Sequence, residues 1–234
     1  MKMKAMKTAS AGLIAGLFLV CVALAPAAKA DAATINFSGT AGGEAVSGTL
    51  VFTVSSAGTL TVSITDNQAN PTDVGQLISD LSFVCSTCGS SSLTGSSGQE
   101  VSISSNIATL GSSVTTEWGL STSGSTIVLS ALGSGQPDDL IIGPGPYTNA
   151  KGSINGNGPH NPFLGGTVTF TLSVSGLTSV NQLSNVIVSF GTTAGDDLSV
   201  GTPTPTPTPE PSSLILLGTG LLGLGTQLRR RVKA

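Results

Sequence analysis

Cys85 and Cys88 form a C-x-x-C pair in the middle of the chain. Such a pair can close a small disulfide, act as a redox dithiol or give two ligands to zinc. Zinc needs two further ligands, and residues 31–200 offer no second cysteine pair and one histidine. A redox dithiol would open a helix, whereas this pair follows an expected strand. We therefore favour a disulfide, worth about 2 kcal/mol by the chain-entropy relation, and keep free thiols and a metal site as alternatives.

Adjacent carboxylates occur twice, at Asp138 and Asp139 and again at Asp196 and Asp197, in segments expected to be loop edges. Calcium takes six to eight oxygen ligands, so two such loops brought together could hold one ion. The spacing matches no EF-hand loop, and solvated turn residues are the ordinary interpretation. The sequence thus requires no cofactor, with calcium as the single candidate.

His160 is the one histidine of the chain, and any nucleophilic triad would have to use it. No G-x-S-x-G elbow occurs, although paired carboxylates for glycoside hydrolysis could lie far apart in the sequence. Tyr147 is the one tyrosine, and Trp118, the one tryptophan, is expected in the core. We predict no catalytic residue. Tyr147 and His160 lie in a long Gly/Pro/Asn-rich connection, residues 143–166, and are the first candidates for ligand contacts.

Alternating patterns predict the strands that must position these residues. In residues 59–65 and 167–174 every second residue is apolar, and the residues between them carry hydroxyl groups. This period of two is typical of half-buried antiparallel strands. Weaker patterns predict strands at residues 34–38, 46–54, 81–85, 101–110, 114–120, 125–132, 140–142 and 186–190. The pattern as a whole predicts an all-β domain, either an antiparallel β-sandwich or a jelly roll.

One short helix is predicted at residues 70–81. Asn70 can cap it, Pro71 suits its first turn and Asp73 can bond back to the cap. Apolar residues then follow at helical spacing, at Val74, Leu77, Ile78 and Leu81. We expect this helix to close one end of the sandwich.

Basic residues are concentrated at the two ends of the chain, four at or before Lys29 and four at or after Arg229. Between Asp31 and Asp197 there are eleven acidic residues and one basic residue, Lys151, so this part has a formal charge of −10. Such a charge repels nucleic acid and anionic membrane surfaces, and it favours cations or neutral partners. Nucleic-acid binding is therefore excluded, and solubility outside the cell is the ordinary interpretation of the charge.

The N-terminus has the order of a secretory signal peptide. Lysines in the first seven residues precede an apolar stretch at residues 11–24 and the sequence Ala28-Lys29-Ala30. We predict that residues 1–30 are removed by signal peptidase before Asp31. An uncleaved membrane helix is the alternative, but the apolar run is short for a span.

Near the C-terminus, an uncharged run at residues 212–228 would make a helix of about 25 Å, followed by Arg229, Arg230 and Arg231. The length is marginal for a bilayer, although arginines can reach its edge. By the positive-inside rule, the arginines stay in the cytoplasm and the preceding chain lies outside. We predict a transmembrane helix in the inner membrane, with a buried core helix as the alternative. In the linker at 201–208, residues 202–208 alternate Thr and Pro, which predicts an extended spacer ahead of the helix.

Pro209, Glu210 and Pro211 precede this apolar run. Together with the terminal arginines, they resemble the PEP-CTERM sorting domain of Gram-negative bacteria. In that family a membrane exosortase recognises the tail and processes the protein near the Pro-Glu-Pro motif. Members are associated with exopolysaccharide or biofilm production, so the resemblance implies an exosortase as processing enzyme and the cell surface or extracellular matrix as destination.

The predicted organisation is a signal peptide at 1–30, an exported β domain at 31–200, a linker at 201–208 and a sorting tail at 209–234. We expect a noncatalytic structural protein of the cell surface or the exopolysaccharide matrix. The first alternative is a binding module for polysaccharide or another envelope component, with or without calcium. A hydrolase is the third hypothesis, and it would need turnover that depends on His160 or a carboxylate.

Overall fold

The computed structural model describes residues 31–133, 137–156, 158–193 and 195–205. These residues form an all-β domain, which confirms the predicted class. The strands are β1 (Asp31–Ala41), β2 (Glu44–Ser56), β3 (Thr59–Asp66), β4 (Ile78–Cys85), β5 (Ser91–Ser104), β6 (Ile107–Val114), β7 (Gly119–Ser123), β8 (Thr126–Ser130), β9 (Ile141–Ile142), β10 (Phe163–Val174), β11 (Leu183–Phe190) and β12 (Asp197–Gly201).

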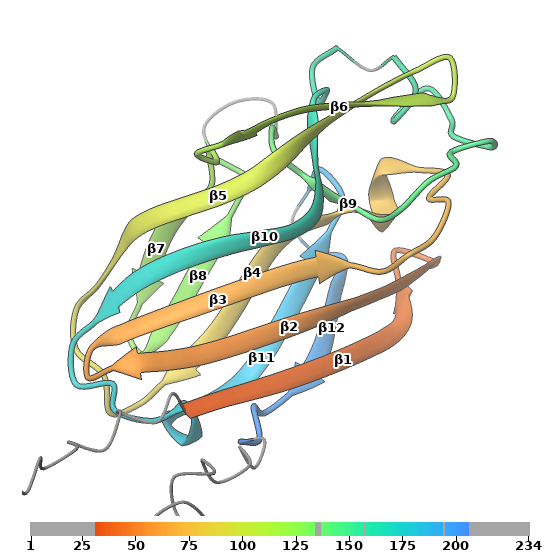
Figure 1. The fold of residues 1–234 in the computed structure, drawn as a ribbon. Coiled ribbons are helices and arrows are strands. Elements are labelled where there is room, and N and C mark those ends of the chain that lie inside the picture. The colour runs from red at the N-terminus through yellow and green to blue at the C-terminus, as the bar shows by residue number, and fades with distance from the viewer. Residues whose placement is uncertain (1–30, 134–136, 157, 194, 206–234) are drawn as a thin grey trace, which may run out of the picture.

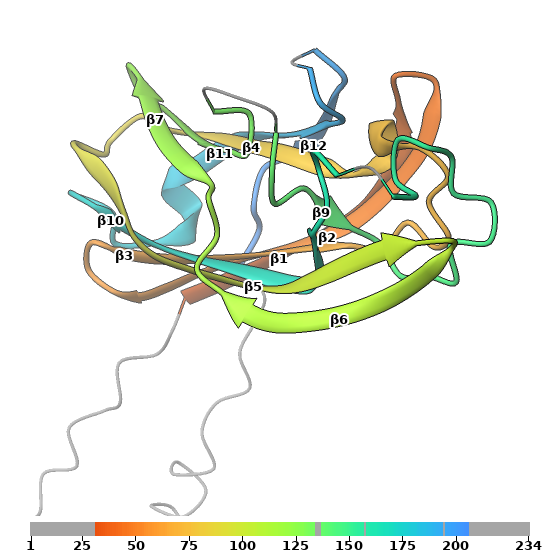
Figure 2. The same cartoon turned by 90° about the horizontal axis from the view of Figure 1, so that it is seen from above.

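The strands form two facing layers (Figure 1 and Figure 2). One layer contains β1, β2, β3, β10, β5 and β6 in this order, and the other contains β12, β11, β4, β8 and β7. The short strand β9 pairs in parallel with β10 and antiparallel with β4, so hydrogen bonding is continuous between the layers. All other strand pairs are antiparallel.

The core lies between the layers and is built from the apolar side of each alternating strand. The rings of Phe52 on β2 and Phe83 on β4 meet edge to face across the core, with centroids 5.6 Å apart. Trp118 is buried, as predicted, with its ring centroid 5.0 Å from that of Phe170 on β10. The outward positions of these strands carry mainly Ser and Thr, so the period of two places one side in the core and the other in solvent.

The predicted strand at residues 101–110 is wrong, because the chain reverses inside it. Ser105 and Asn106 both have positive φ, at 51° and 63°, and connect β5 to β6 as a hairpin. A two-residue turn with both residues in this conformation matches the twist of the flanking strands. The predicted strand at residues 114–120 is also divided, since residues 115–118 separate β6 from β7.

The predicted helix at residues 70–81 is wrong as well. A three-residue 3-10 helix, η1 (Val74–Gln76), is capped by Asp73 rather than Asn70, and Leu77 is already extended. The Gln76 side chain caps the start of this turn, because its Oε1 accepts hydrogen bonds from the backbone N–H groups of Thr72 at 2.7 Å and Asp73 at 3.3 Å. The apolar spacing that suggested a helix belongs to this turn and to the buried side of β4.

The same turn occurs a second time in the chain. The second 3-10 helix, η2 (Val180–Gln182), is capped by Ser179, and Gln182 accepts from the backbone N–H of Thr178 at 2.6 Å. The sequences are Thr-Asp-Val-Gly-Gln-Leu and Thr-Ser-Val-Asn-Gln-Leu, at residues 72–77 and 178–183. Each turn leads into one of the antiparallel neighbours β4 and β11, so the two turns lie at opposite ends of the sandwich.

The first and last described residues meet at the end that contains η2, which we call the exit end. The Asp31 carboxylate accepts hydrogen bonds from the Ser179 hydroxyl at 2.6 Å and the Val180 N–H at 2.9 Å. Ala33 forms an isolated antiparallel bridge with Pro205. The part of the predicted linker that is described therefore lies against the sandwich and is not a free spacer. The predicted signal peptide and sorting tail lie outside the described residues.

Candidate functional site

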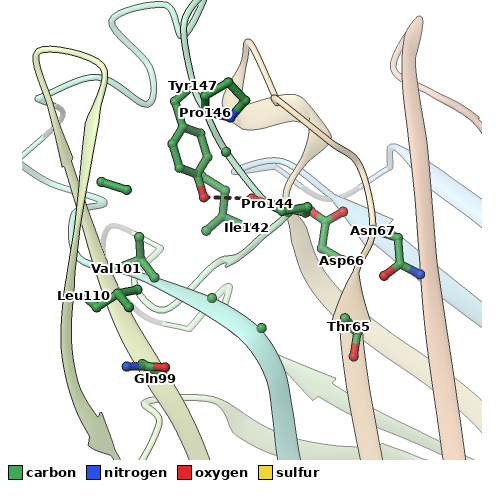
Figure 3. Close-up of a pocket in the computed structure, with 15 residues that line it drawn as sticks. Thr65, Asp66, Asn67, Gln99, Val101, Leu110, Ile142, Pro144, Pro146 and Tyr147 are labelled. Atoms are coloured by element: carbon green, nitrogen blue, oxygen red, sulfur yellow. Dashed lines mark hydrogen bonds between the residues drawn. The ribbon is translucent and has the colours of Figure 1, made fainter.

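A pocket of about 510 Å³ lies at the opposite end of the sandwich, which we call the pocket end. One wall is the β5–β6 hairpin, which contributes Gln99, Val101 and Leu110. Figure 3 shows these residues facing the end of β3, with Tyr147 between the two sides. The size of the pocket, and its mixture of apolar walls with a few polar groups, are typical of small-molecule sites.

Asp66 is the buried charged group of this pocket. It continues the inward alternation of β3 after Leu60, Val62 and Ile64, and its side chain is 2% exposed. Its Oδ1 accepts a hydrogen bond from the Gln68 N–H at 2.8 Å, whereas its Oδ2 is buried without a partner among the described residues. Burial raises the pKa of this carboxyl well above its usual value, although the N–H groups of Gln68 and Gly143 oppose the shift.

Tyr147 forms the back of the pocket in a strained conformation. Its φ of 59° is left-handed, which is unfavourable for a bulky residue, and its side chain is buried. The hydroxyl donates a hydrogen bond to the Gly143 carbonyl at 2.8 Å (Figure 3). Burial raises the pKa of the tyrosine, and the nearby Asp66 carboxylate raises it further. Strain of this kind is often retained where a loop must keep a functional shape.

Of the two ligand contacts predicted from the sequence, Tyr147 lines the pocket and His160 does not. His160 is half-buried, and its Nδ1 lies 2.6 Å from the Pro137 carbonyl oxygen. The pocket residue that was not selected from the sequence is Asp66. A signal for it was present, because an acidic residue stands where the alternation of β3 requires an inward side chain.

The structure does not bring the two aspartate pairs into one ligand group. Asp139 points inward, and its carboxylate accepts from the Glu117 N–H at 2.6 Å, while Asp138 is exposed. Burial raises the pKa of Asp139. Asp197 accepts from the Ser189 hydroxyl at 2.5 Å, and Asp196 is half-buried beside the 42–43 turn. Within the described ranges, no group of three or more His, Cys, Asp or Glu side chains is placed to hold a metal ion.

Cys85 and Cys88 are joined by a disulfide at the exit end, where β4 finishes. Their Cα atoms are 5.3 Å apart, and the Cys88 N–H donates to the Cys85 carbonyl at 3.2 Å. Cys85 is buried in the core, and Cys88 is half-buried and packs against it.

Comparison with known families identifies the C-terminal tail. Residues 207–231 match the model of the PEP-CTERM protein-sorting motif. The match contains the six predicted sorting residues, Pro209, Glu210, Pro211, Arg229, Arg230 and Arg231. The chain thus carries a PEP-CTERM motif, which indicates exosortase-dependent sorting of an exported protein with a membrane-anchored precursor.

The match does not include the described β domain. No curated protein and no solved structure matches the chain. In the part of the chain that the structure describes, no helix has the length and apolar character of a membrane span. The predicted helix at 212–228 lies outside that part.

Proposed function

We propose that this protein is an exported structural component of the cell surface or the exopolysaccharide matrix. In this proposal, signal peptidase removes residues 1–30, and an exosortase cleaves the chain near Pro209-Glu210-Pro211. The observation that carries the proposal is the PEP-CTERM motif at residues 207–231. The formal charge of −10 between Asp31 and Asp197 and the hydroxyl-rich outer faces of the strands suit a solvated extracellular setting.

The geometry of the exit end supports this topology. Asp31 and Pro205 lie at the same end of the sandwich, because Ala33 pairs with Pro205. Both processing enzymes act at the membrane, and a domain whose ends lie together can present both cleavage regions to one membrane. A disulfide at this end also fits an oxidising compartment outside the cytoplasm.

A noncatalytic role is part of the proposal. His160 does not line the pocket, and its Nδ1 lies 2.6 Å from the Pro137 carbonyl oxygen. A second candidate function, a binding module for polysaccharide or another envelope component, is favoured by one observation, the pocket of about 510 Å³ at the pocket end.

Sorting is tested by the intact mass and membrane fractionation of the protein in its native host. We expect Glu210→Ala, or deletion of Arg229, Arg230 and Arg231, to leave a longer precursor in the membrane fraction. Glu44→Ala removes the same charge from the β domain, and replacement of the three arginines by lysine keeps the charge of the cluster. Both controls should be processed, and normal mass and location in the Glu210→Ala and deletion variants would contradict the proposal.

A further inference from the structure

The rim of the pocket carries an apolar side chain that no part of the described chain covers. Leu110 on β6 pairs with Val101 on β5, and cross-strand partners share one side of a sheet. Val101 is buried in the core, so Leu110 lies on the inward side of the hairpin, yet it is 67% exposed. Both residues line the pocket. Leu110 therefore faces the pocket but remains exposed to solvent, so it offers an apolar surface that a ligand could cover.

The polar half of this incomplete contact is Asp66. Its Oδ2 is a buried acceptor without a partner among the described residues, and such an oxygen is stabilised by a hydrogen-bond donor. Gln99 is a second polar residue of the lining, whereas the side chains of Thr65 and Asn67 bond outward, to the hydroxyl groups of Thr167 and Thr49. A ligand that fits both halves must offer an apolar face to Leu110 and hydroxyl groups to this polar side.

The pocket lining contains no cationic side chain, which disfavours an anionic ligand. Lys151 is the one Lys or Arg among residues 31–205, it does not line the pocket, and its ammonium lies 3.5 Å from the Asp73 carboxylate. An acidic sugar or a phosphate would therefore lose its hydration in the pocket with no compensating cation. A neutral sugar ring has one C–H face and a border of hydroxyl groups, which matches the two sides of the pocket.

We propose that this pocket binds one neutral sugar unit of an extracellular glycan, with a sugar hydroxyl donating to Asp66 and the C–H face against Leu110. This proposal deepens the second candidate function and rests on it. Leu110 and Asp66 come from separate strands, and Tyr147 supports the wall between them. The site therefore depends on the tertiary fold and not on a linear motif.

The position of the pocket suits a ligand outside the membrane. In the register of the first layer, Asp66 pairs with Gly48 and Gly48 pairs with Phe37, six residues along β1 from Asp31. At about 3.3 Å per residue, this places the pocket about 20 Å from the exit end along the strands. A membrane-anchored precursor would therefore hold the pocket away from the bilayer.

Binding is tested with the full chain in detergent micelles, using saturation-transfer NMR and methyl glycosides of neutral hexoses and N-acetylhexosamines. Methyl glucuronide and methyl galacturonide serve as charged probes. We expect a neutral glycoside to bind and the uronides to bind at least about tenfold more weakly. Leu110→Ser should weaken binding about tenfold, and Asp66→Asn about threefold to tenfold.

The chain offers a matched control for the rim. Ile107 lies on the same strand and is also 67% exposed, but it does not line the pocket, so Ile107→Ser should bind as the wild type does. Asp138→Asn is the corresponding control for loss of one carboxylate at an exposed site. Equal binding of uronides, or equal effects of Leu110→Ser and Ile107→Ser, would overturn the proposal. Binding of neutral glycosides that survives both pocket variants would place a glycan site elsewhere and keep the binding module. Absence of binding by every glycoside would reject both.

Discussion

The two ends of the sandwich carry the same turn but use it in different surroundings. At the pocket end, Gln76 of η1 is 5% exposed, and its Nε2 donates to the Ala45 carbonyl at 3.0 Å. At the exit end, Gln182 of η2 is half-buried, and its Nε2 donates to the Thr87 hydroxyl at 2.7 Å. One six-residue pattern thus closes both ends, and its surroundings decide how much stability it contributes.

The ends also differ in how completely an aspartate carboxylate is bonded at each of them. The exit end has a disulfide, and the Asp31 carboxylate bonds to both Ser179 and Val180. The pocket end has Asp66, whose Oδ2 lacks a partner among the described residues, and Tyr147 with a positive φ. The exit end is not fully bonded either, because the buried Ser91 hydroxyl, opposite Val174, also lacks a partner in the described part of the chain. The contrast between the ends is therefore one between two carboxylates, Asp31 and Asp66.

The largest expected effect comes from the glutamine of each turn. Gln76→Ala would leave the N–H groups of Thr72 and Asp73 unpaired in a partly buried site, at a cost of about 3 kcal/mol. Gln182→Ala should cost about 1 kcal/mol, because water can reach the same N–H groups at η2. Urea unfolding followed by Trp118 fluorescence would measure both losses. Equal losses would show that burial does not distinguish the two turns.

A smaller effect is expected at the exit end. Replacing Cys85 and Cys88 together by alanine should lower the free energy of unfolding by about 2 kcal/mol, since the disulfide closes a short ring. Hydrogen exchange should increase at η2, beside Cys85, and stay unchanged at η1. A reducing agent should reproduce the effect in the wild type and have none in the double variant. Faster exchange at η1 would mean that the two ends are not independent.

Much of the fold could be predicted from the sequence, because alternation reports directly on strands with one buried side. The strands at residues 59–65 and 167–174 lie inside β3 and β10 for this reason. Residues 91–100 were missed because the first part of β5 is rich in Ser and Gly and lies mostly exposed, so it has no apolar period. The helix at 70–81 failed because the chain becomes extended at Leu77 and its later apolar residues belong to the buried side of β4, a change that apolar spacing does not record.

The site was less predictable, because a pocket depends on contacts between distant segments. Tyr147 was selected as a rare aromatic residue in a long glycine-rich loop, and it lines the pocket. Leu110 was expected inside a continuous strand. The turn at Ser105 and Asn106 instead pairs it with Val101, so it lies at the rim of the pocket and not in the core. Asp66 could have been found from the alternation of β3, although its missing partner could not.

The smallest expected effect concerns the pH dependence of stability at the pocket end. Burial raises the folded-state pKa of Asp66 above its usual 3.8, so its contribution to stability is fully present below pH 3.8. The contribution is lost as pH rises through the folded pKa. Asp66→Asn removes this titration but keeps an oxygen for the Gln68 N–H. The stability of the variant should therefore fall less than that of the wild type between pH 4 and pH 7.

Urea midpoints across this pH range would measure the slope of stability against pH. The slope is the proper measurement, because an unpartnered amide at residue 66 shifts stability equally at every pH. Burial also raises the pKa of Asp80 on β4, so Asp80→Asn should reduce the slope with the same sign. Asp80 lies in the other layer, and the two reductions should add. An unchanged slope in Asp66→Asn would mean that Asp66 stays solvated, and the contrast between the bonded carboxylate of Asp31 and the buried carboxylate of Asp66 would then fail.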